Sequence, residues 1–199
     1  TQSVSGPATV TMTAGVDDVI IGSTGVDTIT LSGLAESGDS VDLLGDADTL
    51  ILDNGTNTIS VSNVETINMT AGAAANIINM ESVLTGVTIN GTAATNDRIN
   101  LGNFANAVTV AGIATIIGGV MDDQITAAAA DMAFNVLAID GGGETTADTL
   151  VITGAVALDA NDMAGVSDIE KIVLASDAAH SLAINDANVL AGEAMTIDA

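Results

Sequence analysis

Residues 15–30 read GVDDVIIGSTGVDTIT, and this stretch decides the fold. Asp18 and Asp27 lie nine residues apart, and each is followed two residues later by an isoleucine. Glycine and aspartate are turn residues, whereas apolar residues two positions apart are typical of a β-strand. The stretch therefore predicts very short strands joined by tight, acidic turns.

The same pattern continues along the chain. Short runs rich in Thr, Val and Ile have apolar positions two apart, and Gly, Asn, Asp or Ser separate most of them. These predicted strands are 10–13, 28–31, 49–52, 58–61, 66–69, 87–90, 98–101, 107–110, 124–126, 149–153, 171–174, 182–185 and 195–198. Three segments are candidates for short helices: 127–134, 158–166 with Asp159 as N-cap, and 187–194.

Internal similarity favours a coiled architecture. Asp48 opens DTLIL and is followed 17 residues later by Glu65 in SNVETINM; Asp148 opens DTLVI and is followed 22 residues later by Glu170 in SDIEKIVL. Residues 110–119 resemble the glutamate element with Ala114 in place of Glu. We interpret this as a compound unit of two different strands with variable loops. Glu65 and Glu170 are interpreted as edge charges that discourage unwanted strand pairing.

The predicted fold class is all-β, a right-handed parallel β-solenoid with short corner helices. Stacked coils place like aliphatic residues on one another, and this chain has no Trp, no Tyr and only two Phe. We expect residues 1–199 to form a single solenoid segment of a longer chain. Tandem Ig-like β-sandwiches are the alternative, although such domains usually carry a buried Trp or Tyr.

Composition excludes several function classes. The chain has 26 acidic residues, two basic residues and a net charge of −24, so it lacks the cations that bind nucleic acid or anionic lipid. No apolar run reaches the length of a membrane span, so we expect no membrane insertion. His180 is the only histidine and no cysteine is present, so we expect no enzyme and no zinc site.

Two stretches approach the calcium-binding nonapeptide G-G-x-G-x-D-x-U-x, in which U is a large apolar residue. Residues 22–30 (GSTGVDTIT) keep Gly22, Gly25 and Asp27, and residues 118–126 (GGVMDDQIT) keep Gly118, Gly119 and Asp123. Calcium requires six or more oxygen ligands, which such turns can supply. The predicted calcium turns are therefore 15–30 and 118–126, with ordinary turns as the alternative reading. Further candidate ligands are Asp18, Asp48, Asp97 and Asp148.

These stretches resemble the RTX (haemolysin-type calcium-binding) repeat family, and also the degenerate β-solenoid arrays of Gram-negative S-layer proteins and RTX adhesins. The resemblance implies secretion to the bacterial cell surface without a cleaved N-terminal signal. It also implies Ca²⁺ as the stabilising ion and a structural or adhesive role. The calcium-binding aspartate of that family corresponds best to Asp27 and Asp123, then to Asp18. Asp48, Asp97 and Asp148 match only the Asp-x-apolar part.

The leading functional hypothesis is a structural extracellular protein, an S-layer or filament subunit that self-associates and is stabilised by calcium. The alternative is an adhesin module that binds glycans, lipopolysaccharide or another surface. A third class is an ice-binding β-solenoid with threonine ladders. Threonines recur at 9–13 and 28–30, but later strands carry Asn, Asp, Ser or Ala, so no continuous ladder is expected.

Overall fold

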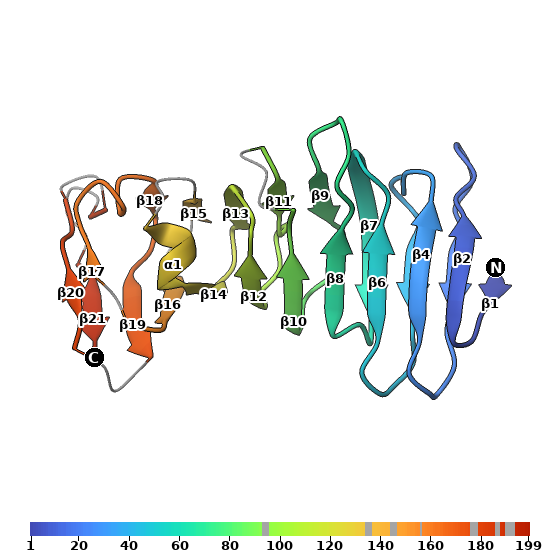
Figure 1. Ribbon diagram of the computed structural model, residues 1–199, viewed down its shortest axis with the longest axis horizontal. Helices are drawn as coiled ribbons and strands as arrows, with labels where there is room; N and C mark the ends of the chain where they lie inside the picture. The colour runs from blue at the N-terminus through green and yellow to red at the C-terminus, as the bar shows by residue number, and fades with distance from the viewer. Residues whose placement is uncertain are drawn as a thin grey trace.

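The computed structural model describes residues 1–92, 96–133, 137–143, 147–155, 157–175, 179–185, 188–189 and 194–199. Within these ranges the chain winds between two long sheets, and each coil gives one short strand to each sheet (Figure 1). Every pairing between the described strands is parallel. The β-solenoid prediction is confirmed, and the sandwich alternative is wrong because it needs antiparallel sheets.

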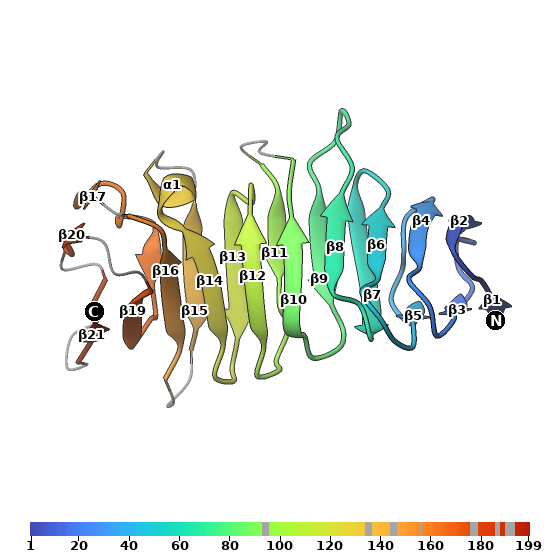
Figure 2. The ribbon, with the colours of Figure 1, turned by 60° about the horizontal axis from the view of Figure 1, so that its bottom comes forward.

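The strands follow one another along the long axis, from the N-terminus at one end to the C-terminus at the other (Figures 1 and 2). The nine-stranded sheet contains β1 (Gln2–Ser3), β3 (Val19–Ile21), β5 (Ser40–Asp42), β7 (Thr56–Ser62), β9 (Ile77–Met80), β11 (Arg98–Asn100), β13 (Thr115–Gly119), β15 (Ala138–Gly142) and β18 (Val166–Ser167). The ten-stranded sheet contains β2 (Pro7–Thr11), β4 (Thr28–Ser32), β6 (Thr49–Leu52), β8 (Thr66–Met69), β10 (Thr85–Asn90), β12 (Ala107–Ala111), β14 (Gln124–Ala128), β16 (Thr149–Thr153), β19 (Lys171–Ala175) and β21 (Thr196–Asp198).

The core lies between the two sheets and consists of stacked aliphatic side chains. In the ten-stranded sheet, Ile29 pairs with Leu50, Leu50 with Ile67, and Ile67 with Ile89, and all four side chains are fully buried. Coils about 4.8 Å apart place each of these side chains directly on the equivalent side chain of the next coil. The buried core is built from aliphatic side chains, as the nearly ring-free composition predicts.

The short helices were predicted with mixed success. Residues 127–134 contain the one-turn helix α1 (Ala129–Met132), which confirms that candidate. The helix predicted for 158–166 is wrong: this segment contains turns, although Oδ1 of Asp159 accepts the backbone N–H groups of Asn161 and Asp162. These turns connect β17 (Ala157–Leu158) to β18. Most of 187–194 lies outside the described residues.

The predicted compound unit is also wrong. Thr49 pairs with Thr66, so DTLIL and ETINM are the same element one coil apart, and β7 in the other sheet lies between them. The same holds for Thr149 and Lys171. Residues 115–119 form β13 of the nine-stranded sheet, so Ala114 is not the equivalent of these glutamates.

The nine-stranded sheet was the harder one to predict. Its strands β1, β3, β5, β9, β15 and β18 were not predicted, since segments such as SVD show too little alternation of apolar and polar residues. A small third sheet pairs β17 with β20 (Ser181–Leu182), which lies at the start of the predicted strand 182–185.

The register changes near the middle of the solenoid. The second half of β7 pairs with β5, whereas its first half pairs with β9. In the ten-stranded sheet, a register shift lies between Thr85 and Val87 of β10, where Gly86 has a positive φ of 73°. The coils before and after this point are therefore offset from one another.

Candidate functional site

Acidic and amide side chains form a ladder along one corner of the solenoid. Each member immediately precedes a strand of the ten-stranded sheet, and its side-chain oxygen accepts the backbone N–H of a residue one coil earlier. We call this the corner ladder; its members are Asp27, Asp48, Glu65, Asn106, Asp123, Asp148 and Glu170.

The hydrogen bonds of the corner ladder are short. The N–H of Asp27 donates to Oδ1 of Asp48 at 2.6 Å, and the N–H of Asp48 donates to Oε2 of Glu65 at 2.7 Å. The later coils repeat this with Asp123 to Asp148 at 2.6 Å and Asp148 to Glu170 at 2.7 Å. The two glutamates thus brace neighbouring coils, and the interpretation of them as edge charges is wrong.

The second oxygen of a ladder aspartate braces its own corner. Oδ2 of Asp27 accepts the N–H of Ser23 at 2.6 Å, and Oδ2 of Asp123 accepts the N–H of Gly119 at 3.1 Å. Both donors lie four residues before the aspartate. One side chain therefore closes its own turn and also ties that turn to the preceding coil.

Asp48 differs from this pattern. The residue four positions earlier is Leu44, with φ of 73°, and its N–H donates to Oδ1 of Asp42 instead, at 3.1 Å. Oδ2 of Asp48 is consequently buried without a hydrogen-bond partner. Burial, together with the charges of Asp27, Glu65 and Asp46, raises the pKa of Asp48.

The pKa values of Asp27 and Asp123 depend on the hydrogen bonds that each carboxylate accepts. Hydrogen bonds lower the pKa of Asp27, and the largest effect comes from the N–H of Ser23. Together these hydrogen bonds outweigh burial, which raises the pKa. Burial raises the pKa of Asp123, because the hydrogen bonds from Asn106 and Gly119 offset that effect only in part. Asn106 shows that an amide also fits this position: its Oδ1 accepts the N–H of Leu84, and its Nδ2 donates to the carbonyl of Phe104.

A second set of polar residues precedes strands of the nine-stranded sheet, at the opposite corner. Asp18 lies here, so Asp18 and Asp27, nine residues apart, lie on opposite sides of the solenoid. The N–H of Asp18 donates to Oδ1 of Asp39 at 2.7 Å. Asp97 accepts the N–H and hydroxyl of Thr92 at 2.7 and 2.6 Å, and these bonds, with one from Asn76, outweigh burial and lower its pKa.

The predicted glycines fall into two groups. At Gly22, an added Cβ would lie 2.8 Å from both Oδ2 of Asp27 and Cα of Leu43, and at Gly118 it would overlap the carbonyl oxygen of Gly141. Gly119 likewise faces the carbonyl of Gly102, whereas Gly25 has open space around it. The first three glycines permit close approach of neighbouring coils, and none of the four has a positive φ.

The predicted calcium ligands take part in hydrogen bonds in this structure. Asp27, Asp48, Asp97, Asp123 and Asp148 are at most 2% exposed, and each has at least one side-chain oxygen that accepts a hydrogen bond from an N–H or O–H group. Calcium needs six or more oxygen ligands around one point. Over the part of the chain that the structure describes, no three His, Cys, Asp or Glu side chains are grouped to hold a metal ion. Calcium binding stays a prediction for solution experiments.

The aspartates that match the template are part of a larger structural set that sequence reasoning missed. Glu65, Asn106 and Glu170 belong to the corner ladder, and Asp39 and Asn76 belong to the opposite corner. Their shared signal is a polar residue directly before a strand, as in Glu65-Thr66 and Asn106-Ala107. The calcium template hides this signal because it accepts only Asp.

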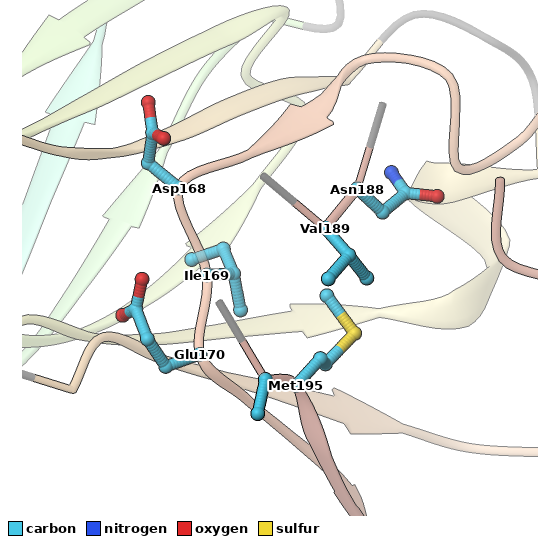
Figure 3. A pocket seen from close by; sticks show the side chains of 7 residues that line it. Asp168, Ile169, Glu170, Asn188, Val189 and Met195 are labelled. Atoms are coloured by element: carbon cyan, nitrogen blue, oxygen red, sulfur yellow. The ribbon is translucent and has the colours of Figure 1, made fainter. Parts of the chain in front are cut away.

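Cavities open along the described part of the solenoid. A groove of about 420 Å³ opens where the register changes, between residues 61–65 and 82–87, and contains Glu65, Val83 and Leu84. A much smaller pocket near the C-terminal end has a volume of about 10 Å³, enough for one water molecule. Figure 3 shows Ile169, Val189 and Met195 facing one another in that pocket, beside Asp168 and Glu170.

The outer face of the ten-stranded sheet carries a continuous threonine column. The paired positions along it are Thr28, Thr49, Thr66, Thr88, Thr109 and Thr126. This single column was not recognised from the sequence, whereas the neighbouring column passes from Thr30 to Ile51 and Asn68, so the Thr-x-Thr pattern itself does not continue. Coils of 17 to 25 residues and the shift within β10 hide the column from the sequence.

No helix among the described residues has the length and apolarity needed to cross a bilayer. Comparisons with models of protein families, with curated proteins and with solved structures found no match to this chain.

Proposed function

We propose that this chain is a structural segment of an extracellular surface layer or filament and that it self-associates. The corner ladder is the observation that supports this proposal. The ladder aspartates Asp27, Asp48, Asp123 and Asp148 are buried, and their side chains hold neighbouring coils together. The ladder joins coils on either side of the β10 coil, where Leu84 takes the ladder position, and coils joined in this way suit a load-bearing or lattice-forming role.

Cations are expected to assist assembly by acting on the exposed acids. A net charge of −24 makes separate copies repel one another and opposes compaction. Salt shortens the range of that repulsion to about 8 Å at physiological ionic strength. The buried ladder aspartates accept backbone hydrogen bonds from neighbouring coils, so this proposal assigns the cations to the exposed acids.

Adhesion is the second candidate, favoured by the groove of about 420 Å³. That volume lies within the range of small-ligand sites, about 300–1,000 Å³. The groove is lined by valine, leucine, serine, threonine, asparagine and one glutamate, without the aromatic ring on which sugars commonly stack. Self-association is therefore the better supported of the two functions.

The experiment is to purify residues 1–199 and follow their assembly by light scattering and electron microscopy, with Na⁺, Mg²⁺ or Ca²⁺ added at matched ionic strength. Ordered sheets or filaments, or a concentration-dependent oligomer, are the expected result. A chain that stays monomeric in all three salts and binds a glycan array would instead favour adhesion.

A further inference from the structure

The strongly acidic chain has one long face without charge. The first eight strands of the ten-stranded sheet, β2 to β16, contain no Asp, Glu, Lys, Arg or His. We call the outward side chains of these eight strands the threonine face. In contrast, the nine-stranded sheet places Asp42, Arg98 and Asp140 in its strands, at positions that are not buried.

The threonine face is regular as well as neutral. Its threonine column, from Thr28 to Thr126, repeats at the strand spacing of about 4.8 Å. Beside it lies a second column that contains Thr30, Ile51 and Asn68, in which the amide of Asn90 donates to Oδ1 of Asn68 at 2.9 Å. β-branched threonines have few rotamers, so ordering them at a contact costs little entropy.

We propose that the threonine face is the surface through which a second copy of this chain packs. This inference rests on the proposed function and names the contact that self-association would use. Two chains that each carry a charge of −24 can approach closely only where neither presents carboxylates. The threonine face meets that condition over eight consecutive strands, and the exposed acids stay at the corners and on the opposite sheet.

The size of the face is sufficient for a specific contact. Eight strands about 4.8 Å apart, each of about five residues, cover about 600 Å² on each copy. Two copies would bury about 1,200 Å², at the lower end of the range for stable interfaces. Because the same surface is used on both sides, the contact is two-fold symmetric, and threonine hydroxyls, which both donate and accept, can pair across it.

The test introduces one carboxylate into the face and one outside it, in the same coil. Thr109→Glu places a charge at the centre of the threonine face, on β12, and Thr115→Glu places it on β13 of the other sheet. Thr66→Glu and Ser60→Glu form a second matched pair in an earlier coil. Circular dichroism establishes that each variant is folded, and sedimentation equilibrium gives its oligomeric state.

We expect the unmodified chain, Thr115→Glu and Ser60→Glu to associate equally, and Thr109→Glu and Thr66→Glu to weaken association at least about tenfold. Equal association of all folded variants would overturn this face as the contact while leaving self-association intact. A monomeric unmodified chain would overturn both proposals. If that monomer shows thermal hysteresis in ice, or binds a neutral crystalline polysaccharide, and Thr109→Glu abolishes the effect, the face serves another partner.

Discussion

The backbone N–H of Asp27 donates a 2.6 Å hydrogen bond to Oδ1 of Asp48, which lies 21 residues later in the chain. Oδ2 of the same carboxylate is buried and has no partner. Asp48 therefore binds the preceding coil with one oxygen and leaves the other in an environment that opposes its charge.

Asp48→Asn is expected to stabilise the protein at neutral pH. The amide keeps an oxygen for the N–H of Asp27 and removes a buried charge, and Asn106 already shows an amide at this position. The expected gain is about 1 kcal/mol, or about 2–4 °C in melting temperature. The control is Asp27→Asn, which should lower the melting temperature because both oxygens of Asp27 accept N–H groups.

The benefit of Asp48→Asn should depend on pH. The pKa of Asp48 is higher in the folded protein than in the unfolded chain, where it is about 3.9. Between these two pKa values, Asp48 is protonated in the folded protein and ionised in the unfolded chain. The stability of the unmodified protein thus falls as pH rises through the folded pKa. Calorimetry should find no advantage for Asp48→Asn in acid and the full advantage at neutral pH. An advantage that is constant with pH would contradict this account.

Thr92→Val should have the opposite pH signature. The hydroxyl of Thr92 donates to Oδ2 of Asp97 at 2.6 Å and helps to lower the pKa of Asp97. The stability that this hydrogen bond contributes is therefore present above the pKa of Asp97 in the unfolded chain, and it is lost as pH falls through the pKa of Asp97 in the folded protein. We expect a loss of about 1–2 kcal/mol at neutral pH that shrinks in acid. Thr115→Val, on the outer face of β13, is the control, and denaturant titrations provide the measurement.

Gly118→Ala should destabilise the solenoid more than a surface glycine change does. Its Cβ would overlap the carbonyl of Gly141 and lie 2.6 Å from Oδ2 of Asp123. The coils would have to separate, at an expected cost of about 1–3 kcal/mol or more. Gly45→Ala, where a Cβ meets nothing within 4 Å, should be close to neutral. Equal melting temperatures for the two variants would show that the coils at Gly118 and Gly141 lie far enough apart to accept a Cβ.

Chelation tests the calcium prediction directly. Since the ladder aspartates accept hydrogen bonds in place of metal coordination, EDTA should leave the thermal melt by circular dichroism unchanged at constant ionic strength. Added NaCl, MgCl₂ and CaCl₂ should each raise the melting temperature through screening of the net charge. A large drop that only calcium reverses would restore the calcium-turn hypothesis for Asp27 and Asp123.

The sequence predicted the fold class and most of the ten-stranded sheet, because these depend on local chemistry. Alternation in segments such as TLIL (49–52), glycine and aspartate at turns, and a nearly ring-free composition all act within a few residues. Those signals predict short strands joined by turns, and they do so without information on which coil residues pair with one another. They also placed Asp27 and Asp123 correctly at corners.

Only the tertiary structure decided which residue lies above which. Coil length varies from 17 residues between Asp48 and Glu65 to 25 between Asp123 and Asp148, so equivalent positions do not recur at one period. For that reason Glu65 was not recognised as a ladder member, and the column from Thr28 to Thr126 was not foreseen. Register depends on contacts between coils distant in sequence, and no local pattern encodes them.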